Sequence, residues 1–373
     1  MRTHIWWHFC RSPAYCPPHK AVVTHRTPPG VVSATGLDRQ HEPDGQLLSL
    51  ALPQNGERSS RHLDLIPMKI TSRRIALFII ASALSNGSAR AQTNADPAAE
   101  ALALELLTAD RAFAAAAPKL NVIDALGAMF AADVIMPAPP GVFAKNREEA
   151  LTMLRGNPDN ARAHLDWAPV RAGVSGDGRQ GFTFGFMTLT RPDSSQVPMK
   201  YLAYWRKDGN AWTVIAYKRV GRPAGRVSTD VMSSSLPPRI LAPNTNPADL
   251  ARLEKELGDA ERAFSAEAGK IGLGPAFKRN GAPDAMNMGG PQNAGFVIGP
   301  DAISKNVGGT DATPSALTWA PDERIIVASS GDLGITVGFI NAPDPQGGAA
   351  RRLPFMTVWK RASPNSPWQY VAE

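Results

Sequence analysis

The chain has 373 residues, with 40 lysines and arginines against 33 aspartates and glutamates, and a formal charge of +7. The positive excess lies in residues 1–91, which hold 11 basic and five acidic residues, whereas the remainder holds 29 and 28. Nucleic-acid partners need clustered positive charge, so they are excluded for the remainder. Both cysteines and six of the seven histidines precede Met68. Zinc sites, thiol nucleophiles and disulfides are therefore excluded beyond Met68, and we expect neither a metal nor a cofactor.

Residues 68–91 show the three parts of a secretory signal peptide in order. A basic start is followed by the apolar stretch Ile75–Leu84 and then by Ala-Arg-Ala at 89–91. The apolar stretch has ten residues, about half of the ~20 that a membrane-spanning helix needs, so we expect no stable membrane anchor after cleavage. A buried helix of a globular domain is the alternative. The signal peptide predicts a periplasmic or secreted bacterial protein.

Residues 1–67 show no sustained period of 2 or 3.6 residues, so they predict neither strands nor amphipathic helices. A signal peptide must begin the protein that it exports. We therefore interpret Met68 as the true initiator and residues 1–67 as a non-native, disordered upstream extension.

The rest of the chain contains two copies of one unit. The offset between matching residues grows slowly along the chain, from 151 to 156, as loop insertions would produce. The matching segments are A-D-R-A-F at 109–113 with A-E-R-A-F at 260–264, L-D-W-A-P at 165–169 with L-T-W-A-P at 317–321, G-F-T-F-G-F at 181–186 with G-I-T-V-G-F at 334–339, and the tryptophan pairs 205/359 and 212/368.

The two copies predict domains at 96–223 and 247–373, joined by a semi-extended linker, rich in Ser and Pro, at 224–246. Each domain begins with a helix, because Asp96 and Asn246 are N-cap residues followed by Pro at the first helical position. Apolar residues at helical spacing then form one face: Leu102, Leu106, Ala109 and Phe113 in the first copy, and Leu250, Leu253, Leu257, Ala260 and Phe264 in the second.

Further helices and a meander of strands complete each copy. Helices are predicted at 121–130 and from Asn146, where Glu149 stands at capping-box spacing. The second copy is rich in Gly, Pro and Asn over 271–295, so we expect a short or distorted helix there. Strands are predicted at 134–136, 163–170, 181–190, 197–207 and 211–218, with a hairpin turn at 207–210.

One strand has two clearly different faces. Phe182, Phe184 and Phe186 alternate with glycine and threonine, and the second copy keeps the pattern with Ile335 and Val337. We expect the bulky face to pack on the helices and the glycines to permit a bend or the close approach of another layer.

This order of elements resembles the cone-shaped α+β fold shared by nuclear transport factor 2, ketosteroid isomerase and the SnoaL-like polyketide cyclases. The residues are most similar to bacterial SnoaL-like domains of unknown function, through D-R-A-F in the first helix, L-x-W-x-P at the start of the long strands, S-x-G-D-x-G-x-T-x-G in the next, and two tryptophans near the end. Glu261 and the segment 271–295 depart from that pattern. The resemblance implies two tandem α+β domains, each with N-terminal helices packed on a curved antiparallel sheet around a pocket. It implies no particular reaction, because enzymes and non-enzymes share the fold.

Two aspartates at matching positions, Asp133 and Asp284, follow the second helices. A buried aspartate has a raised pKa and could act as a general base, so Asp133 is the catalytic candidate. The alternative is a solvated or capping role at a helix-to-strand turn. No tyrosine lies on either first helix, so the isomerase constellation of an acid pair with a base is incomplete.

Other polar pairs have simpler interpretations. His164 and Asp166 share one strand face and could form a dyad, but Leu165 and Trp167 occupy the opposite face, which is the better core. The pairs Asp110-Arg111 and Glu261-Arg262 are interpreted as surface or structural ion pairs rather than catalytic groups.

Aromatic residues of the strands either pack a core or line an apolar cavity. We expect an exported monomer whose two domains pair sheet to sheet, and which binds a small apolar molecule or has an accessory, structural role. The alternative is an acid–base enzyme of the isomerase, cyclase or dehydratase type. The candidate ligand-binding residues are Met136, Trp167, Phe186, Tyr201, Asp284, Asn287, Trp319, Phe339 and Phe355.

Overall fold

The computed structural model describes residues 96–139, 141–344 and 347–373. The predicted signal peptide and the upstream extension lie outside the described residues. Within the described ranges, none of the helices combines the length and the apolar composition required to cross a membrane.

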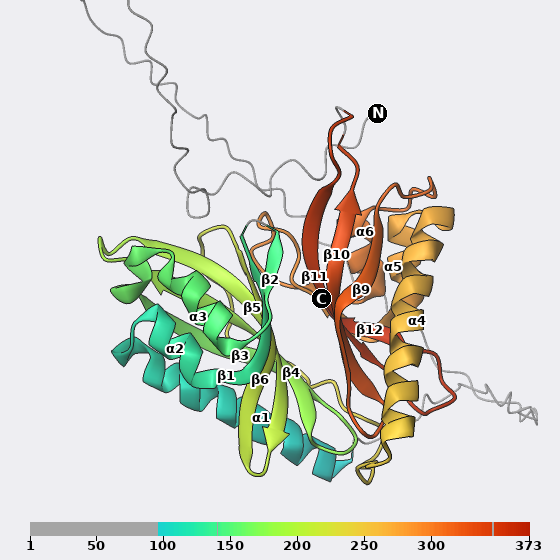
Figure 1. Ribbon diagram of the computed structural model, residues 1–373, viewed down its shortest axis with the longest axis horizontal. Helices are drawn as coiled ribbons and strands as arrows, with labels where there is room; N and C mark the ends of the chain where they lie inside the picture. Colours follow the sequence, from blue (N-terminus) through green and yellow to red (C-terminus); the bar gives the residue numbers. More distant parts are fainter. Residues whose placement is uncertain (1–95, 140, 345–346) are drawn as a thin grey trace, which may run out of the picture. The chain divides into compact units, whose positions relative to one another are not determined.

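The first domain places its helices beside one six-stranded sheet (Figure 1). The strand order is β2-β1-β6-β5-β4-β3, and all neighbours are antiparallel except β1 and β6. In chain order the elements are α1 (Pro97–Ala116), a 3-10 turn (Ala117–Lys119), α2 (Val122–Met129), β1 (Phe130–Ala138), β2 (Val142–Ala144), α3 (Arg147–Arg155), a 3-10 turn (Pro158–Ala161), β3 (His164–Val174), β4 (Gln180–Thr190), β5 (Gln196–Asp208) and β6 (Ala211–Gly221).

The second domain repeats this arrangement strand for strand. Its sheet order is β8-β7-β12-β11-β10-β9, with β7 and β12 as the parallel pair, so the predicted α+β class with two similar domains is confirmed. Its elements are α4 (Pro247–Ile271), α5 (Leu273–Asn280), β7 (Gly281–Asn287), β8 (Val297–Ile298), α6 (Pro300–Val307), β9 (Thr318–Val327), β10 (Leu333–Ala342), β11 (Arg351–Lys360) and β12 (Gln369–Ala372).

The helix starts follow the predicted caps. Asp96 accepts a hydrogen bond from the backbone N–H of Ala98 at 2.9 Å, and Asn246 accepts one from Ala248 at 3.0 Å. At α3 Asn146 accepts from the backbone N–H of Glu149, and the Glu149 carboxylate accepts from the backbone N–H of Lys145 and from the Asn146 side chain, a variant of the capping box. These bonds satisfy donors that every helix leaves free at its start.

The segment 271–295 is more regular than its composition suggests. It holds α5, which has eight residues like α2, and β7. A side chain on Gly274 would place its Cβ 1.8 Å from the carbonyl oxygen of Gly309, so this glycine permits two backbones to pack closely. The second helix is therefore short, as one of the two expected alternatives had it, and its glycine serves packing rather than flexibility.

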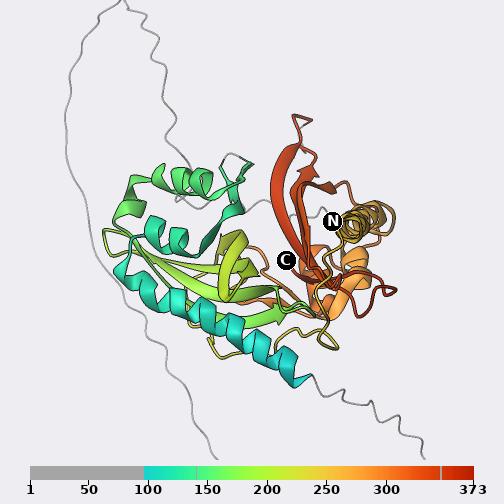
Figure 2. The same ribbon diagram turned by 60° about the horizontal axis from the view of Figure 1, so that its bottom comes forward.

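The expected partner of the bulky strand face is also wrong. The glycine face lies against the helices: a Cβ on Gly181 would lie 2.6 Å from Leu106 of α1, and one on Gly334 would lie 2.6 Å from Leu257 of α4. α1 runs along β3 and β4 on this side (Figure 2). The predicted close approach of another layer is thus confirmed, and that layer is the first helix of each domain.

The bulky faces of the two sheets pack against each other. One apolar cluster contains Phe182, Phe184, Leu202 and Ile215 of the first sheet together with Ile335, Val337, Met356 and Val358 of the second, all buried. Phe143 of β2 and Phe339 of β10 make an edge-to-face contact with ring centroids 5.0 Å apart.

Polar contacts across this junction occur in matching pairs. Arg171 of β3 binds the Asp284 carboxylate of β7 at 3.0 Å, and Arg324 of β9 donates to the backbone carbonyl of Asp133 in β1. Matching loops also exchange bonds, since Asp332 accepts from the N–H of Gly176 and Asp177 accepts from the N–H of Ser330. The two domains therefore use equivalent surfaces, as the two subunits of a symmetric dimer would.

The segment between the domains forms backbone hydrogen bonds with β3. Ser235 donates to the carbonyl of Ala172 at 2.8 Å and accepts from the N–H of Val174 at 3.2 Å, so the segment forms a parallel bridge beside β3. This bridge partly covers an otherwise free sheet edge.

Candidate functional site

A buried carboxylate lies between α1 and the sheet of the first domain. Asp110 has no exposed surface. The indole N–H of Trp167 donates to its Oδ1 at 2.8 Å, and the hydroxyl of Tyr201 donates to its Oδ2 at 2.8 Å. The acid therefore joins the first helix to strands β3 and β5.

The second domain has the same feature with a longer acid. Glu261 of α4 is fully buried and accepts from Trp319 at 2.5 Å, from Thr336 at 2.5 Å and from Trp359 at 2.8 Å. Phe355 occupies the place of Tyr201 and offers no hydroxyl. Glu261 instead accepts from Thr336 and Trp359, whose counterparts Thr183 and Trp205 hydrogen-bond to each other in the first domain.

Burial raises the pKa of both acids, and the hydrogen bonds from the surrounding donors oppose that rise. Burial also raises the pKa of Tyr201, and the nearby Asp110 adds to the rise, so the phenol stays a donor. Both oxygens of each carboxylate are engaged within the domain. The arrangement suits a structural tie between helix and sheet.

The sequence interpretation of these acids as surface or ion-paired groups is incomplete. Asp110 lies on the same helical face as Leu106 and Phe113, four residues before it and three after it. That spacing was the available signal, since a charged residue inside an apolar stripe must find buried partners.

Asp133 does not occupy a pocket. Its side chain is 52% exposed, and Arg206 holds it through two hydrogen bonds, at 2.9 and 3.1 Å. These bonds hold the pKa of Asp133 below its usual value, the opposite of what a general base requires. A shift of register in β1 between Phe130 and Ile135 leaves Asp133 at the surface, so its predicted location is corrected.

The matching aspartate of the second domain is likewise an ion-pair partner. Arg171 and Lys360 bind Asp284 at 3.0 and 2.7 Å. Burial acts to raise the pKa of Asp284, but the two cations and Ser235 outweigh it, so the pKa is lowered. Asn287 is buried and donates to the Glu373 side chain at 2.8 Å.

The predicted lining residues divide into three places. Met136, Trp167 and Tyr201 lie in the helix-covered core of the first domain, and Trp319 and Phe355 lie in that of the second. Phe186 instead contacts Phe296, with ring centroids 4.8 Å apart, and Phe339 belongs to the cluster between the sheets. Their assignment to a pocket is corrected, because they stand on the face that the other domain covers.

His164 and Asp166 do not form a dyad. The Nδ1 atom of His164 lies 2.8 Å from the carbonyl oxygen of Leu120, and both side chains are on the exposed face of β3, as expected. Among residues 96–373 as described, no cluster of three or more His, Cys, Asp or Glu side chains could hold a metal ion.

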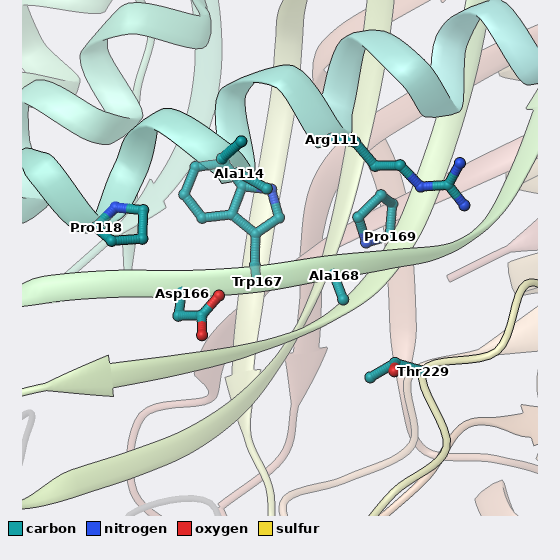
Figure 3. A pocket seen from close by; sticks show the side chains of 9 residues that line it. Arg111, Ala114, Pro118, Asp166, Trp167, Ala168, Pro169 and Thr229 are labelled. Carbon is teal, nitrogen blue, oxygen red and sulfur yellow. The ribbon is translucent and has the colours of Figure 1, made fainter.

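A pocket of about 340 Å³ opens between α1 and β3 of the first domain (Figure 3). Arg111 and Asp166 place one charge of each sign at it, and the indole of Trp167 extends from β3 toward α1 (Figure 3). Its other lining residues are Ala114, Ala115, Pro118, Ala168, Pro169 and Thr229, which are mostly apolar. The volume falls within the range typical of small-molecule sites.

The second domain differs at the corresponding position. Ser265 stands where the first domain has Ala114, and its hydroxyl accepts the backbone N–H of Trp319 at 2.9 Å. This bond ties α4 directly to β9. Thr229 comes from the segment between the domains, which runs beside β3. The pocket is therefore built from the first domain together with the segment between the domains.

No protein-family model and no curated protein matches this chain. Solved structures similar to parts of it include an NTF-2 like protein of unknown function from Shewanella oneidensis, with 13% identity, a TM-score of 0.26, and coverage of 31% of this chain and 95% of that one. A ketosteroid isomerase-like protein from Erwinia carotovora atroseptica has 16% identity, a TM-score of 0.25, and coverage of 34% and 95%. An LEH-like epoxide hydrolase from M. tuberculosis has 16% identity, a TM-score of 0.25, and coverage of 32% and 84%. The fold assignment rests on the strand order and helix placement of the two domains, not on these likenesses.

Proposed function

We propose that this protein is an exported binding protein whose first domain takes up a small, largely apolar molecule in the pocket between α1 and β3. The observation that carries the proposal is the apolar lining of that pocket by alanines, prolines and Trp167. The polar groups at its edge, Arg111 and Asp166, would orient a ligand rather than react with it.

The buried acids support binding rather than catalysis. Asp110 and Glu261 are saturated by indole and hydroxyl donors of their own domain, and Asp133 is held by Arg206. An acid–base enzyme would have to use Asp110, whose pKa is raised and which shares Trp167 with the pocket. That alternative requires Trp167 to move and expose the carboxylate to a substrate.

Export is part of the proposal. The signal peptide at 68–91 supports it, because its three parts occur in order and its apolar stretch is too short to span a bilayer. A binding protein outside the cytoplasm would meet small molecules before they enter the cell.

Filling the pocket should abolish binding of an uncharged apolar probe. Ala115 is an exposed residue of α1 that lines the pocket, and Ala266 is its exposed counterpart on α4. We expect Ala115→Phe to weaken binding of N-phenyl-1-naphthylamine, measured by its fluorescence, by at least about tenfold, a difference of ~1.4 kcal/mol. Ala266→Phe should leave the affinity unchanged.

Two outcomes would decide against the binding site. Equal losses in the two phenylalanine variants would place the probe elsewhere, and unchanged binding in Ala115→Phe would do the same. Asp110→Asn tests the enzyme alternative. Under the binding proposal this change lowers the stability of the protein, but the variant that does fold still binds the probe.

A further inference from the structure

A second pocket, of about 240 Å³, lies beside α4 of the second domain. It is bounded by the segment 238–244 between the domains, by α4, by the turn between β9 and β10, and by the residues after β11. It shares no lining residue with the pocket between α1 and β3.

Three arginines from three different segments line this second pocket. They are Arg239 between the domains, Arg252 on α4 and Arg361 after β11, and Asp332 is the one acidic residue that also lines it. Asp332 is already engaged, since it accepts from the N–H of Gly176 at 2.8 Å and from Ser330 at 2.5 Å. The pocket therefore presents more positive than negative groups.

The equivalent position in the first domain differs from this cluster of arginines. There Lys207 binds Glu105 at 2.6 Å, and the indole N–H of Trp212 donates to the same carboxylate at 3.1 Å. One lysine and one indole thus share one acid, which pairs with no second cation.

In the second domain the equivalent acid pairs with two cations. Glu256 binds both Arg252, at 2.5 Å, and Arg361, at 3.2 Å. Arg252 also lies 3.6 Å from Asp249. The side chain of Arg361 is only 4% exposed, and its Nη2 atom is buried without a hydrogen-bond partner among the described residues, as is the indole nitrogen of Trp368.

Arg239 differs from the other two arginines of the pocket, which both pair with Glu256. It is exposed and forms no ion pair with any residue that the structure describes. The remaining walls are apolar and include Pro238, Leu241, Leu253 and Pro364. A lining that combines arginines with apolar side chains favours a ligand that combines a carboxylate or phosphate with a small apolar body.

We infer that this pocket, enclosed by Arg239, Arg252 and Arg361, is a binding site for a small organic anion. Guanidinium groups bind carboxylates and phosphates through paired N–H donors, and these charge-assisted hydrogen bonds are about twice as strong as those to a neutral acceptor. The site is independent of the proposed apolar pocket in the first domain, so each can be tested without the other.

Calorimetric titration of the full chain with phenyl phosphate and, separately, with benzoate tests the inference. We expect at least one of them to bind, Arg239→Ala to weaken that binding by about tenfold or more, and benzyl alcohol not to bind. Arg239 is exposed, so its removal should leave folding intact. Arg226→Ala, an exposed arginine of the same segment outside the pocket, should have no effect, and neither should Ala115→Phe.

The two anions distinguish phosphate from carboxylate recognition, and binding of either supports the site. Absence of heat with both anions would overturn the inference. So would equal losses in Arg239→Ala and Arg226→Ala, which would indicate general attraction by surface charge. A loss confined to Ala115→Phe would place the anion in the first pocket instead.

Discussion

Replacing Glu261 by alanine is expected to destabilise the protein by about 3–5 kcal/mol, because the change removes a buried acceptor shared by three donors and leaves the Trp319 indole N–H without any acceptor. Trp319, Thr336 and Trp359 all donate to this carboxylate. The lost side chain also leaves a cavity between α4 and the sheet. Urea unfolding followed by tryptophan fluorescence measures the change.

Glu254→Ala is the matched control, since Glu254 lies on the exposed side of the same helix and forms no hydrogen bond or ion pair with other residues of the described ranges. It should alter stability by no more than ~0.5 kcal/mol. A Glu261→Ala penalty of similar size would contradict the structural role of the acid.

The stability penalty of Glu261→Ala should depend on pH, and the direction of that dependence follows from the pKa of Glu261. Burial raises the pKa of Glu261 in the folded state, so the folded protein binds more protons than the unfolded chain between the two pKa values. The contribution of Glu261 to stability is therefore complete below its unfolded pKa, near 4.5, and declines as the pH rises through the folded pKa. The penalty of Glu261→Ala should be larger at pH 4.5 than at pH 8.

Replacing Lys200 by methionine is the second large expected effect, at about 2–4 kcal/mol. Lys200 of β5 is fully buried, and its ammonium group donates to the backbone carbonyls of Met288, Asn293 and Gly295 in the second domain. Three carbonyls would lose their donor. Hydrogen exchange should then show faster exchange of backbone amides in residues 288–295, while those in β4 keep their protection.

Two comparisons make the Lys200 result specific. Lys119→Met, at an exposed position, should change stability little. Burial, with a smaller contribution from Arg222, lowers the pKa of Lys200 from its ordinary value of 10.5 to about 8. Between these two pH values the unfolded chain therefore binds more protons than the folded protein. Wild-type stability relative to Lys200→Met should rise over that range, and a fall would contradict the burial of the ammonium group.

The repeat made most of the fold predictable. Caps at Asp96, Asn146 and Asn246, and the turn after Lys207, depend on local chemistry that a short stretch of sequence contains in full. The order of helices and strands followed from the same local signals. The two copies then reinforced each other, since a feature present in both is unlikely to be accidental.

The partners of the strand faces could not be predicted in the same way. Alternation separates Phe182 and Phe184 from Gly181, but it does not say which face meets the helices and which meets the other sheet. Both layers are apolar, so hydrophobicity alone could not decide. The glycines were the better guide, because a helix can approach a sheet closely only where side chains are absent.

The positions of the two acids could not be predicted from the sequence for a different reason. Asp133 depends on a shift of strand register, and Asp110 depends on donors from strands that lie more than 50 residues away in sequence. Neither the shift of register nor these distant partners can be seen in a local sequence pattern. The pocket between α1 and β3 was equally hidden, because it depends on an alanine where the second copy has Ser265.

Sheet-to-sheet pairing of the two copies organises the whole chain. It covers both bulky faces, leaves the helix sides open, and places both pockets away from the junction core. The surfaces that would join two chains in a symmetric dimer are used up within one, so we expect a monomer in sedimentation equilibrium.

A double-mutant cycle between Phe143 and Phe339 tests this pairing most directly, with each ring replaced by leucine. Their contact joins β2 of one domain to β10 of the other, and such aromatic pairs contribute about 0.5–1.5 kcal/mol beyond their burial. We predict a coupling free energy in that range, and none between Phe143 and Phe264, which lies in the helix-covered core of the second domain. A coupling between Phe143 and Phe339 that is zero within error would contradict the face-to-face pairing of the two sheets.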